Sequence, residues 1–528
     1  MRSQAVVTAA VLTCALVSGG WLVERGSRSG VRDTASQARL LDEVFQHLRN
    51  DYVDPLADSV LYRRAVAGVL LELHDPHSVF LDPKRLGALN ESTSGHYAGV
   101  GIQMDVRDSG IMVLGTLPGA SAERVGILAG DRIVEIDGKP TTGLTSEETI
   151  KTLRGTPGST VRVSVNRPGV AARIPFTLTR SIIEVNPVQH ALLLPESDAG
   201  YVDLSVFSAA AAADLRHAID SLRSAGAKSL VLDLRGNPGG LLDQGVAVAD
   251  LFLDAGQSIV ATKGRIPTDT RAYADREPQH YAEMPLIVLT DSGSASASEI
   301  VAGALQDHDR ALVVGTATYG KGSAQELFKV SDGAVKLTTA LWYTPSGRSI
   351  NRPRTISADE SDEPIVADSA KARPKFHTDG GRTVLGGGGI VPDVEVAGAI
   401  TPPAQRELQA ALGTKVATFR SAIVDFALSL RASHAIASPD FAVTPAMRDG
   451  LYRELTQHGV TVPRAVYDSA APFVSRALAG QVTRFVFGPR AQFARALHDD
   501  PTVARAEALL RGAPTQKQLL ERAAAKKG

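Results

Sequence analysis

The 528-residue sequence contains a single cysteine, Cys14, and no excess of either charge. One thiol excludes an intramolecular disulfide framework and a metal site built from several cysteines. Lys and Arg total 56 against 57 Asp and Glu, which argues against a dedicated nucleic-acid binder and against an acidic, solvating chain. Apolar residues make up 44% of the sequence, so there is material for buried cores. At roughly 150 residues per domain, the length favours three or four domains.

The first apolar segment, residues 5–23, contains no charge, and Arg2 precedes it. About 20 apolar residues span a bilayer, so the segment is predicted to be a membrane anchor or the core of a signal peptide. Arg2 favours an amino terminus that stays inside and a chain that is exported. An anchor is favoured because the apolar run continues through 21–23, with cleavage after the small residues 18–20 as the alternative. We therefore expect residues 1–30 to place the protein on the periplasmic, extracytoplasmic side of a bacterial inner membrane.

A helical region is predicted over residues 31–95. Residues 37–74 carry apolar side chains at helical spacing in two segments, which a polar stretch at 51–55 separates. A proline follows Asp75 and ends the second segment. The histidines beside it are therefore interpreted as part of a turn and not as metal ligands.

Residues 96–182 are predicted to form a small β-rich barrel with one or two helices. Short alternating strands are separated there by regularly placed glycine turns. One amphipathic helix fits Thr145–Leu153, with Thr145 or Ser146 as its N-cap and Glu148 in its first turn.

An α/β core is predicted over residues 183–398, because strands alternate with helices from about residue 200 onward. The strand at 229–234 is almost continuously apolar, which is typical of a buried parallel strand. Further strands at 258–262 and 335–343 are expected to extend the same set.

Residues 352–388 interrupt this core and are predicted to be an exposed, partly disordered insert, since they combine an acidic stretch with four glycines. The last region, 399–528, is predicted to be helical with a solvated surface, because its helices carry charges of both signs. The whole is a multidomain α/β (α+β) chain.

Three segments near the predicted sheet carry residues suited to catalysis. The serine-rich segment 292–300 follows an apolar strand and opens a helix. Ser296 and Glu299 fit a capping box, which is a structural role. A serine at a helix N-terminus also lies among unpaired N–H groups that stabilise an oxyanion, so it is a candidate nucleophile. The residues alone do not distinguish Ser296 from Ser294 and Ser298.

The other two segments are rich in glycine. In 233–240, glycines let the backbone turn after a buried strand and present N–H groups to a ligand, although an ordinary strand-to-helix turn explains them too. In 319–325, Lys321 stands between two glycines. The common fate of a lysine is solvent exposure. A buried Lys321 would have reason to lose its proton and act as a general base, and Gln325 could then orient the amine without adding charge.

A Ser–His–Asp triad is the alternative within the same region, and His308 is its nearest source. His308 falls at the end of the helix that Ser296 begins. At about 1.5 Å per residue, the helix separates the two by about 18 Å, which is too far for proton transfer. A Ser–Lys arrangement is therefore the better fit.

In this order, the segments resemble those of the C-terminal processing peptidases, also called tail-specific proteases. The resemblance extends from about Leu41 to Val396 and is highly specific as a set. The matching segments are Asp75–Ser78, Gly99–Ile102, Leu128–Ile133, Ile136–Gly138, Leu234–Gly240, Ser294–Ile300, Tyr319–Gln325, Tyr343–Arg348 and Gly389–Asp393.

The resemblance implies a ClpP/crotonase-like core with Ser296 as the nucleophile and Lys321 as the general base. It places Gln325 beside the lysine as the residue that positions it. It implies no metal, nucleotide or other cofactor. The oxyanion donors would be the backbone N–H groups of Ala297 and of Gly239 or Gly240.

The resemblance also implies a PDZ-like β-barrel that adds the free end of a protein tail to its sheet edge as a strand. The loop that binds the carboxylate would consist of Gly99, Val100, Gly101 and Ile102. The pocket for an apolar last side chain would be lined by Ile102, Met104, Ile150 and Leu153.

The implied function is that of a serine endopeptidase that cleaves proteins or peptides with free, apolar C-termini. The alternative is a PDZ-based binding scaffold with latent or absent peptidase activity, against which the intact set of Ser296, Lys321 and Gln325 argues. A homo-oligomer or an adaptor protein is compatible with both. Nucleic acid is not an expected partner, and the expected membrane contact is the segment 5–23.

Overall fold

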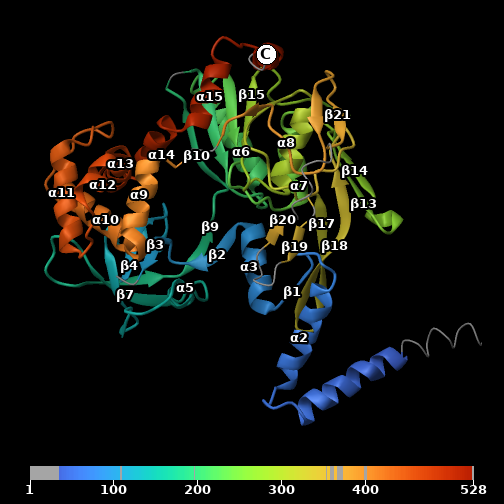
Figure 1. Ribbon diagram of the computed structural model, residues 1–528, viewed down its shortest axis with the longest axis horizontal. Helices are drawn as coiled ribbons and strands as arrows, with labels where there is room; N and C mark the ends of the chain where they lie inside the picture. The colour runs from blue at the N-terminus through green and yellow to red at the C-terminus, as the bar shows by residue number, and fades with distance from the viewer. Residues whose placement is uncertain are drawn as a thin grey trace, which may run out of the picture. The chain divides into compact units, whose positions relative to one another are not determined.

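The computed structural model describes residues 35–107, 110–195, 197–352, 354–356, 362–364, 373–397 and 401–525 (Figure 1). The predicted anchor at 5–23 lies outside these residues. Among the helices that are described, none is long and apolar enough to cross a membrane. The chain divides into two compact units. The first contains the described residues of Met1–Phe80, Leu327–Leu337 and Thr355–Asp362, and the second contains the rest.

The first unit consists mainly of two helices, over 35–50 and over Asp58–Leu71 (α2), as the sequence predicts. Phe45 meets Tyr62 edge-on, with ring centroids 4.6 Å apart, and this contact joins the two helices. The predicted turn after α2 is confirmed, because the Asp75 carboxylate accepts hydrogen bonds from the backbone N–H of His77 and the hydroxyl of Ser78.

The second unit begins with a helix and a small β domain. The helix is Pro83–Ser94 (α3). The sheet of the β domain follows the order β3-β4-β5-β7-β8, with β6 on β5, and a separate ribbon pairs β2 with β9. The path ends at β3 and β8 in the pairings of the described residues, so the predicted barrel closure is not confirmed. The elements are β2 (His96–Gly99), β3 (Ile102–Arg107), β4 (Gly110–Thr116), α4 (Ser121–Arg124), β5 (Arg132–Ile136), β6 (Lys139–Pro140), α5 (Ser146–Leu153), β7 (Thr160–Asn166), β8 (Ile174–Thr179) and β9 (Ser181–Glu184).

Helix α5 begins with the predicted capping box. Thr145 Oγ1 accepts a hydrogen bond from Glu148 N, and the Glu148 carboxylate accepts one from Thr145 N. We expect Thr145→Ala to destabilise α5 by about 1 kcal/mol, because the substitution leaves a helix-end N–H unpaired. Amide hydrogen exchange in α5 of the whole chain should then be about fivefold faster. Ser146→Ala, at the exposed neighbour, is the control, and an equal effect of both variants would contradict the assignment of Thr145 as the cap.

The α/β core is built on a six-stranded sheet in the order β10-β11-β12-β15-β16-β23, parallel except for β10. Successive residues of β12 alternate between its faces: Leu230 and Leu232 pack on one side and Val231 on the other. This confirms the predicted buried parallel strand. The strands are β10 (Val188–Leu193), β11 (Ala199–Leu204), β12 (Ser229–Asp233), β15 (Leu286–Thr290), β16 (Leu312–Gly315) and β23 (Val394–Glu395).

Helices cover both faces of this sheet (Figure 1). The first face carries α6 (Ala211–Ser224), α7 (Leu242–Asp250) and α8 (Ala297–Asp307), in line with the predicted alternation of strands and helices. The second face carries α15 (Pro501–Leu510) and α16 (Gln516–Ala525), whose Leu509 and Leu519 are fully buried. The end of the chain therefore completes the α/β core.

The strands expected to extend the main sheet form a separate antiparallel sheet, so that part of the prediction is wrong. Its order is β1-β18-β13-β14, and β17 pairs with β18. The elements are β1 (Val79–Leu81), β13 (Ser258–Gly264), η1 (Pro267–Asp269), β14 (Arg271–Ala274), β17 (Ser323–Val330) and β18 (Gly333–Tyr343).

The predicted exposed insert is ordered in its second half, and the prediction is wrong there. β21 (Lys375–His377) and β22 (Thr383–Leu385) form an antiparallel hairpin, and Arg382 binds Asp309 and Asp393 of the core. Two charged pairs thus hold a segment whose composition predicts disorder. Within the first half, β19 (Arg354–Ile356) pairs with β20 (Asp362–Pro364).

Most of the remaining C-terminal helices share a core of their own and pack against the β domain. There α10 lies beside β3 and β4 in Figure 1, and Arg484 of α13 donates to the carbonyl oxygen of Leu114 in β4. Arg132 of β5 pairs with Asp425, and Arg431 donates to the carbonyl oxygen of Ala129 at 2.9 Å. The predicted solvated surface is therefore partly an interface. These helices are α9 (Pro403–Leu412), η2 (Gly413–Lys415), α10 (Val416–Ala432), α11 (Pro445–Gln457), α12 (Arg464–Ser469) and α13 (Ala471–Phe487), whereas the next helix, α14 (Pro489–His498), buries Leu497 on the second face of the α/β sheet.

Candidate active site

Ser296 is the N-cap residue of α8, at the end of the loop that leaves the buried strand β15. Its backbone has φ +55° and ψ −113°, in the left-handed half of conformational space that residues other than glycine seldom occupy. Such strain persists only where the surrounding structure enforces it, and it concentrates at functional sites. The predicted helix start is confirmed, and the strained residue is the proposed nucleophile.

The two other candidate serines are buried and donate hydrogen bonds to backbone oxygens. Ser294 Oγ donates to the Leu234 carbonyl at 2.8 Å, and Ser298 Oγ donates to the Asn237 carbonyl at 2.9 Å. Both side chains are fully buried, whereas Ser296 is partly exposed. Burial therefore favours Ser296 among the three serines that the sequence leaves open.

Glu299, one turn into α8, is the residue that sequence reasoning assigned only to a helix cap. Its fully buried carboxylate accepts four hydrogen bonds, from Ser296 N (2.9 Å), Thr318 Oγ1 (2.5 Å), Gly320 N (2.7 Å) and Lys321 N (2.9 Å). Burial raises the pKa of Glu299, and these four bonds partly oppose the rise. A buried carboxylate is stable only with such partners.

The same carboxylate oxygen fixes how far apart the two proposed catalytic residues can be. Ser296 N and Lys321 N each lie 2.9 Å from Glu299 Oε2, so the two nitrogens are at most 5.8 Å apart. A buried acid thus ties the backbones of residues that are 25 positions apart in the sequence. The structure brings the serine loop and the lysine loop together, as a Ser–Lys pair requires.

The glycines beside Lys321 are needed because other backbone segments pass close to them. A Cβ at Gly320 would lie 2.8 Å from Arg352 Cβ, and one at Gly322 would lie 2.9 Å from Asn351 N. On the other side, Tyr319 N donates to the Ser294 carbonyl at 3.0 Å. The lysine loop is therefore fixed from both sides.

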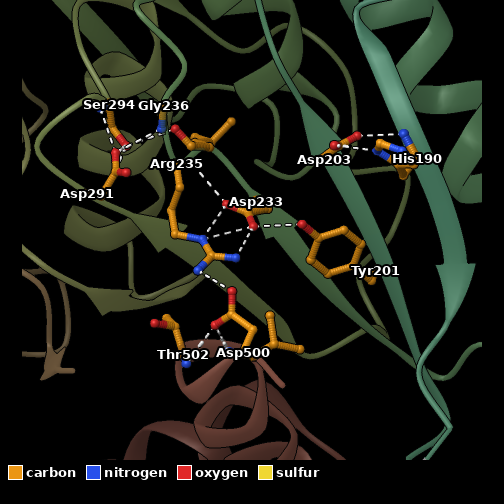
Figure 2. Close-up of polar contacts among 12 residues, drawn as sticks. His190, Tyr201, Asp203, Asp233, Arg235, Gly236, Asp291, Ser294, Asp500 and Thr502 are labelled. Carbon is orange, nitrogen blue, oxygen red and sulfur yellow. Dashed lines mark hydrogen bonds and ion pairs between the residues drawn. The ribbon is translucent and has the colours of Figure 1, made fainter. Parts of the chain in front are cut away.

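The glycine-rich loop after β12 is bonded to the serine loop (Figure 2). Gly236 N donates to Asp291 Oδ1 at 2.8 Å, and Ala295 N donates to the Asn237 carbonyl at 3.0 Å. A Cβ at Gly239 would lie 2.8 Å from Ser296 Cβ and 2.9 Å from Ala297 N, so only glycine allows this approach. The predicted oxyanion residues therefore lie together beside Ser296.

One of the predicted oxyanion donors, the Gly239 N–H, already has a hydrogen-bond acceptor. Gly239 N already donates to Asn237 Oδ1 at 2.9 Å. The neighbouring Gly240 has φ +152° and forms an isolated parallel bridge with Phe207. The Gly239 N–H therefore becomes fully available to an oxyanion only after the Asn237 side chain has turned away.

The proposed helper Gln325 lies at the beginning of β17, partly exposed. Its amide Nε2 donates to Ser323 Oγ at 2.9 Å and to Thr338 Oγ1 at 3.2 Å. These bonds orient the amide from β17 and β18. Its action on Lys321 stays a prediction.

The histidine alternative is disfavoured by the geometry. His308 is the C-cap of the helix whose N-cap is Ser296, so the length of α8 separates the two. Its Nδ1 lies 2.7 Å from Asp379 Oδ2, and its Nε2 lies 2.7 Å from the Ser258 carbonyl oxygen. Both ring nitrogens are engaged away from the serine.

Two family models match the chain: peptidase family S41 over residues 198–360 and the PDZ domain over residues 88–166. The carboxy-terminal-processing protease of Bartonella bacilliformis is 41% identical over 324 residues, which cover 60% of this chain and 74% of that protein. The carboxyl-terminal-processing protease of Synechocystis is 37% identical over 62% of this chain and 78% of its own length. Among solved structures, the photosystem II D1 C-terminal processing protease is 30% identical, with a TM-score of 0.36, over 68% of this chain and 87% of that one.

The chain belongs to the C-terminal processing protease family. It is a serine peptidase of family S41 with a PDZ domain. In this protease, the β domain described above corresponds to the PDZ match, and the α/β core carries the serine and lysine loops.

The predicted carboxylate loop of the protease's PDZ domain joins β2 to β3. Gly101 has φ +74°, and a Cβ there would overlap Ala120 Cβ at 2.1 Å, so glycine is required. Val100 and Leu153 are buried in the domain core, while Ile150 is 40% exposed. Ile102 and Met104 are partly buried beside the same core. Of the predicted pocket residues, Leu153 therefore acts mainly in packing, and Ile150 is accessible to a peptide.

Figure 2 shows a charged network at the end of β12 that the sequence patterns do not predict. Asp233, only 5% exposed, accepts hydrogen bonds from Tyr201 Oη at 2.7 Å and from the guanidinium of Arg235. Nη1 of Arg235 also donates to Asp500 Oδ2 at 2.8 Å. Burial raises the pKa of Tyr201, and the neighbouring Asp233 raises it further. The glycine-rich loop of the protease thus starts from a buried ion pair that reaches the C-terminal helices.

Proposed function

We propose that this protease is an exported, membrane-anchored endopeptidase that cleaves protein substrates near their C-termini through Ser296 and Lys321. The observation that carries the proposal is the shared oxygen of Glu299, which holds the backbones of both residues. The strained backbone of Ser296 and the close approach of Gly239 support it. The uncharged segment 5–23 supports export and anchoring.

These residues suit the following reaction. The Lys321 amine takes the proton of Ser296 Oγ, and the oxygen attacks the scissile carbonyl carbon. The N–H of Ala297 and an N–H of the glycine loop at Gly239 or Gly240 bind the oxyanion. The C–N bond breaks as Lys321 returns the proton to the leaving amine. Water then attacks the acyl-enzyme, giving its proton to the same lysine, and the released Ser296 hydroxyl regains a proton.

In this mechanism, the PDZ domain recognises the free tail of the substrate. The chain end would pair with β3, and the N–H groups of the loop from Gly99 to Ile102 would bind its carboxylate. Apolar side chains such as Ile150 favour an apolar last residue. Gln325 keeps the lysine amine directed at the serine without adding charge.

A substrate whose C-terminus is amidated is expected to be cleaved with a KM at least about tenfold higher and an unchanged kcat, because hydrogen bonds to a charged carboxylate contribute about 1.5–3 kcal/mol. The measurement uses one unfolded protein with an apolar tail, prepared with a free and with an amidated end, and mass spectrometry identifies the cut sites. A substrate with one internal Glu→Gln change is the control for loss of charge. Equal KM values for the free and amidated tails would rule out carboxylate recognition.

A further inference from the structure

The C-terminal helices bind the α/β core through polar contacts as well as apolar packing. Phe493 of α14 stacks on His190 with ring centroids 3.5 Å apart. Glu507 of α15 accepts a hydrogen bond from Ser197 Oγ at 3.0 Å, and Gln516 of α16 accepts one from Leu286 N at 2.7 Å. These contacts, with the buried leucines, dock the helices independently of any single residue.

A further contact, made by Asp500 at the start of α15, reaches the active-site loop. Its Oδ1 caps α15 by accepting from Thr502 N (2.8 Å) and Val503 N (3.1 Å). Its other oxygen, Oδ2, accepts from Nη1 of Arg235 at 2.8 Å (Figure 2). The Arg235 and Asp500 side chains are 23% and 22% exposed, so the charged bond is shielded from water.

Arg235 stands immediately before the part of the loop that approaches Ser296. Asp233 binds Nε and Nη2 of the guanidinium, and Asp500 binds Nη1. The next residue, Gly236, is bonded to Asp291 of the serine loop. Arg235 is therefore one peptide unit away from the hydrogen bond between Gly236 and Asp291, which joins the glycine-rich loop to the serine loop. A movement of Arg235 should shift this bond.

We propose that Asp500 is a positioning residue of this active site: by holding Nη1 of Arg235, it makes the docked C-terminal helices set the position of the oxyanion-binding loop 236–240. The inference rests on the proposed peptidase function. It gives the C-terminal helices a part in the reaction that acts through Arg235. Because α10 and α13 of the same region bind the PDZ domain, Asp500 also lies at the core end of a continuous run of contacts from the tail-binding domain.

The test is Asp500→Asn. An asparagine keeps an oxygen for the helix cap, but its amide nitrogen faces Nη1 of Arg235 with a second donor. We expect kcat to fall about tenfold with KM within about twofold of wild type, because the oxyanion donors act in the transition state and the tail is bound elsewhere. The temperature of unfolding should stay nearly unchanged. Asp499→Asn, at the exposed neighbouring residue, removes the same charge and should have no effect.

A second measurement does not depend on activity. Hydrogen exchange of the backbone amides of residues 236, 237, 239 and 240 should be faster in Asp500→Asn than in wild type or Asp499→Asn. Asp500→Ala should show the same kcat as Asp500→Asn and, in addition, a lower temperature of unfolding, because the cap is lost. Unchanged kcat and unchanged exchange in Asp500→Asn would overturn the inference, as would an activity loss that only follows loss of folded protein. If Ser296→Ala cleaves as fast as wild type, the proposed function fails, and the exchange measurement still decides the role of Asp500.

Discussion

Ser296→Ala and Lys321→Arg are each expected to lower kcat at least about 10³-fold on an unfolded protein with an apolar tail. Alanine removes the oxygen that forms the acyl-enzyme. Arginine is a long basic side chain too, but it stays protonated and so cannot accept the proton that Ser296 must lose. Both variants keep the backbone bonds to Glu299, so circular dichroism and thermal unfolding should match wild type.

Matched serine variants separate the nucleophile from its neighbours. Ser292→Ala, at an exposed position of the same loop, should be as active as wild type. Ser294→Ala and Ser298→Ala each lose a buried hydrogen bond, so the free energy of unfolding should fall by about 1 kcal/mol in each variant. Both variants should still cleave the substrate. If Ser296→Ala retained activity and one of these two did not, the assignment of the nucleophile would be wrong. Loss of activity in His308→Ala, with its fold intact, would instead support the histidine alternative.

Much of the fold could be predicted because local pattern and final packing agree. The apolar run at Leu230–Leu232 is buried on both faces in a parallel sheet, and helix α5 starts at the capping box that Thr145 and Glu148 predict. The separate antiparallel sheet was missed because β13 pairs with β18 across a long stretch of sequence. Strand patterns show which segments are extended, but they do not show which strands pair.

Composition gave wrong predictions where a few ion pairs bind a polar segment to the rest of the protein. Glycine and acidic residues predict a disordered insert, yet Arg382 binds Asp309, 73 positions earlier, and holds the hairpin β21–β22 on the core. Likewise, the charges of the C-terminal helices predict solvated surfaces, while Asp425 and Arg431 bind the PDZ domain. Ion pairs between distant segments leave no periodic trace in a sequence.

The candidate site also combines features that the sequence predicts with features that it does not. Serine, lysine and glycine stand in short segments whose chemistry can be recognised from sequence. Their mutual arrangement depends on Glu299 and Arg235, which local patterns describe as a helix cap and a loop arginine. The partner of Arg235 is 265 positions away, so no local rule could have found it.

Glu299→Gln is the second variant with a large expected effect, a loss of about 10²-fold in kcat. Each oxygen of Glu299 accepts two hydrogen bonds, Oε1 from Thr318 and Gly320 and Oε2 from Ser296 and Lys321. A glutamine offers one oxygen and one NH₂ group. Whichever way its amide turns, at least one buried backbone N–H then faces another donor.

If the NH₂ group takes the place of Oε2, the backbones of Ser296 and Lys321 lose their common acceptor and move apart. If it takes the place of Oε1, Thr318 and Gly320 are displaced, and the lysine loop shifts as a whole. Either outcome disturbs the Ser–Lys geometry by a fraction of an ångström to an ångström, which is enough to lower a proton-transfer step about 10²-fold. The expected loss therefore appears in kcat, while KM for the PDZ-bound tail stays close to wild type.

The control for Glu299→Gln is Glu283→Gln, the same chemical change at an exposed position of the core. Thermal unfolding should fall for Glu299→Gln and not for Glu283→Gln, since only the first leaves buried donors unpaired. A helix cap alone would predict a different result: modest destabilisation and a kcat close to wild type for the protein that remains folded. Measuring kcat per folded molecule well below the unfolding temperature separates the two roles. An unchanged value would reduce Glu299 to a cap and remove the link between the serine and the lysine on which the proposed mechanism depends.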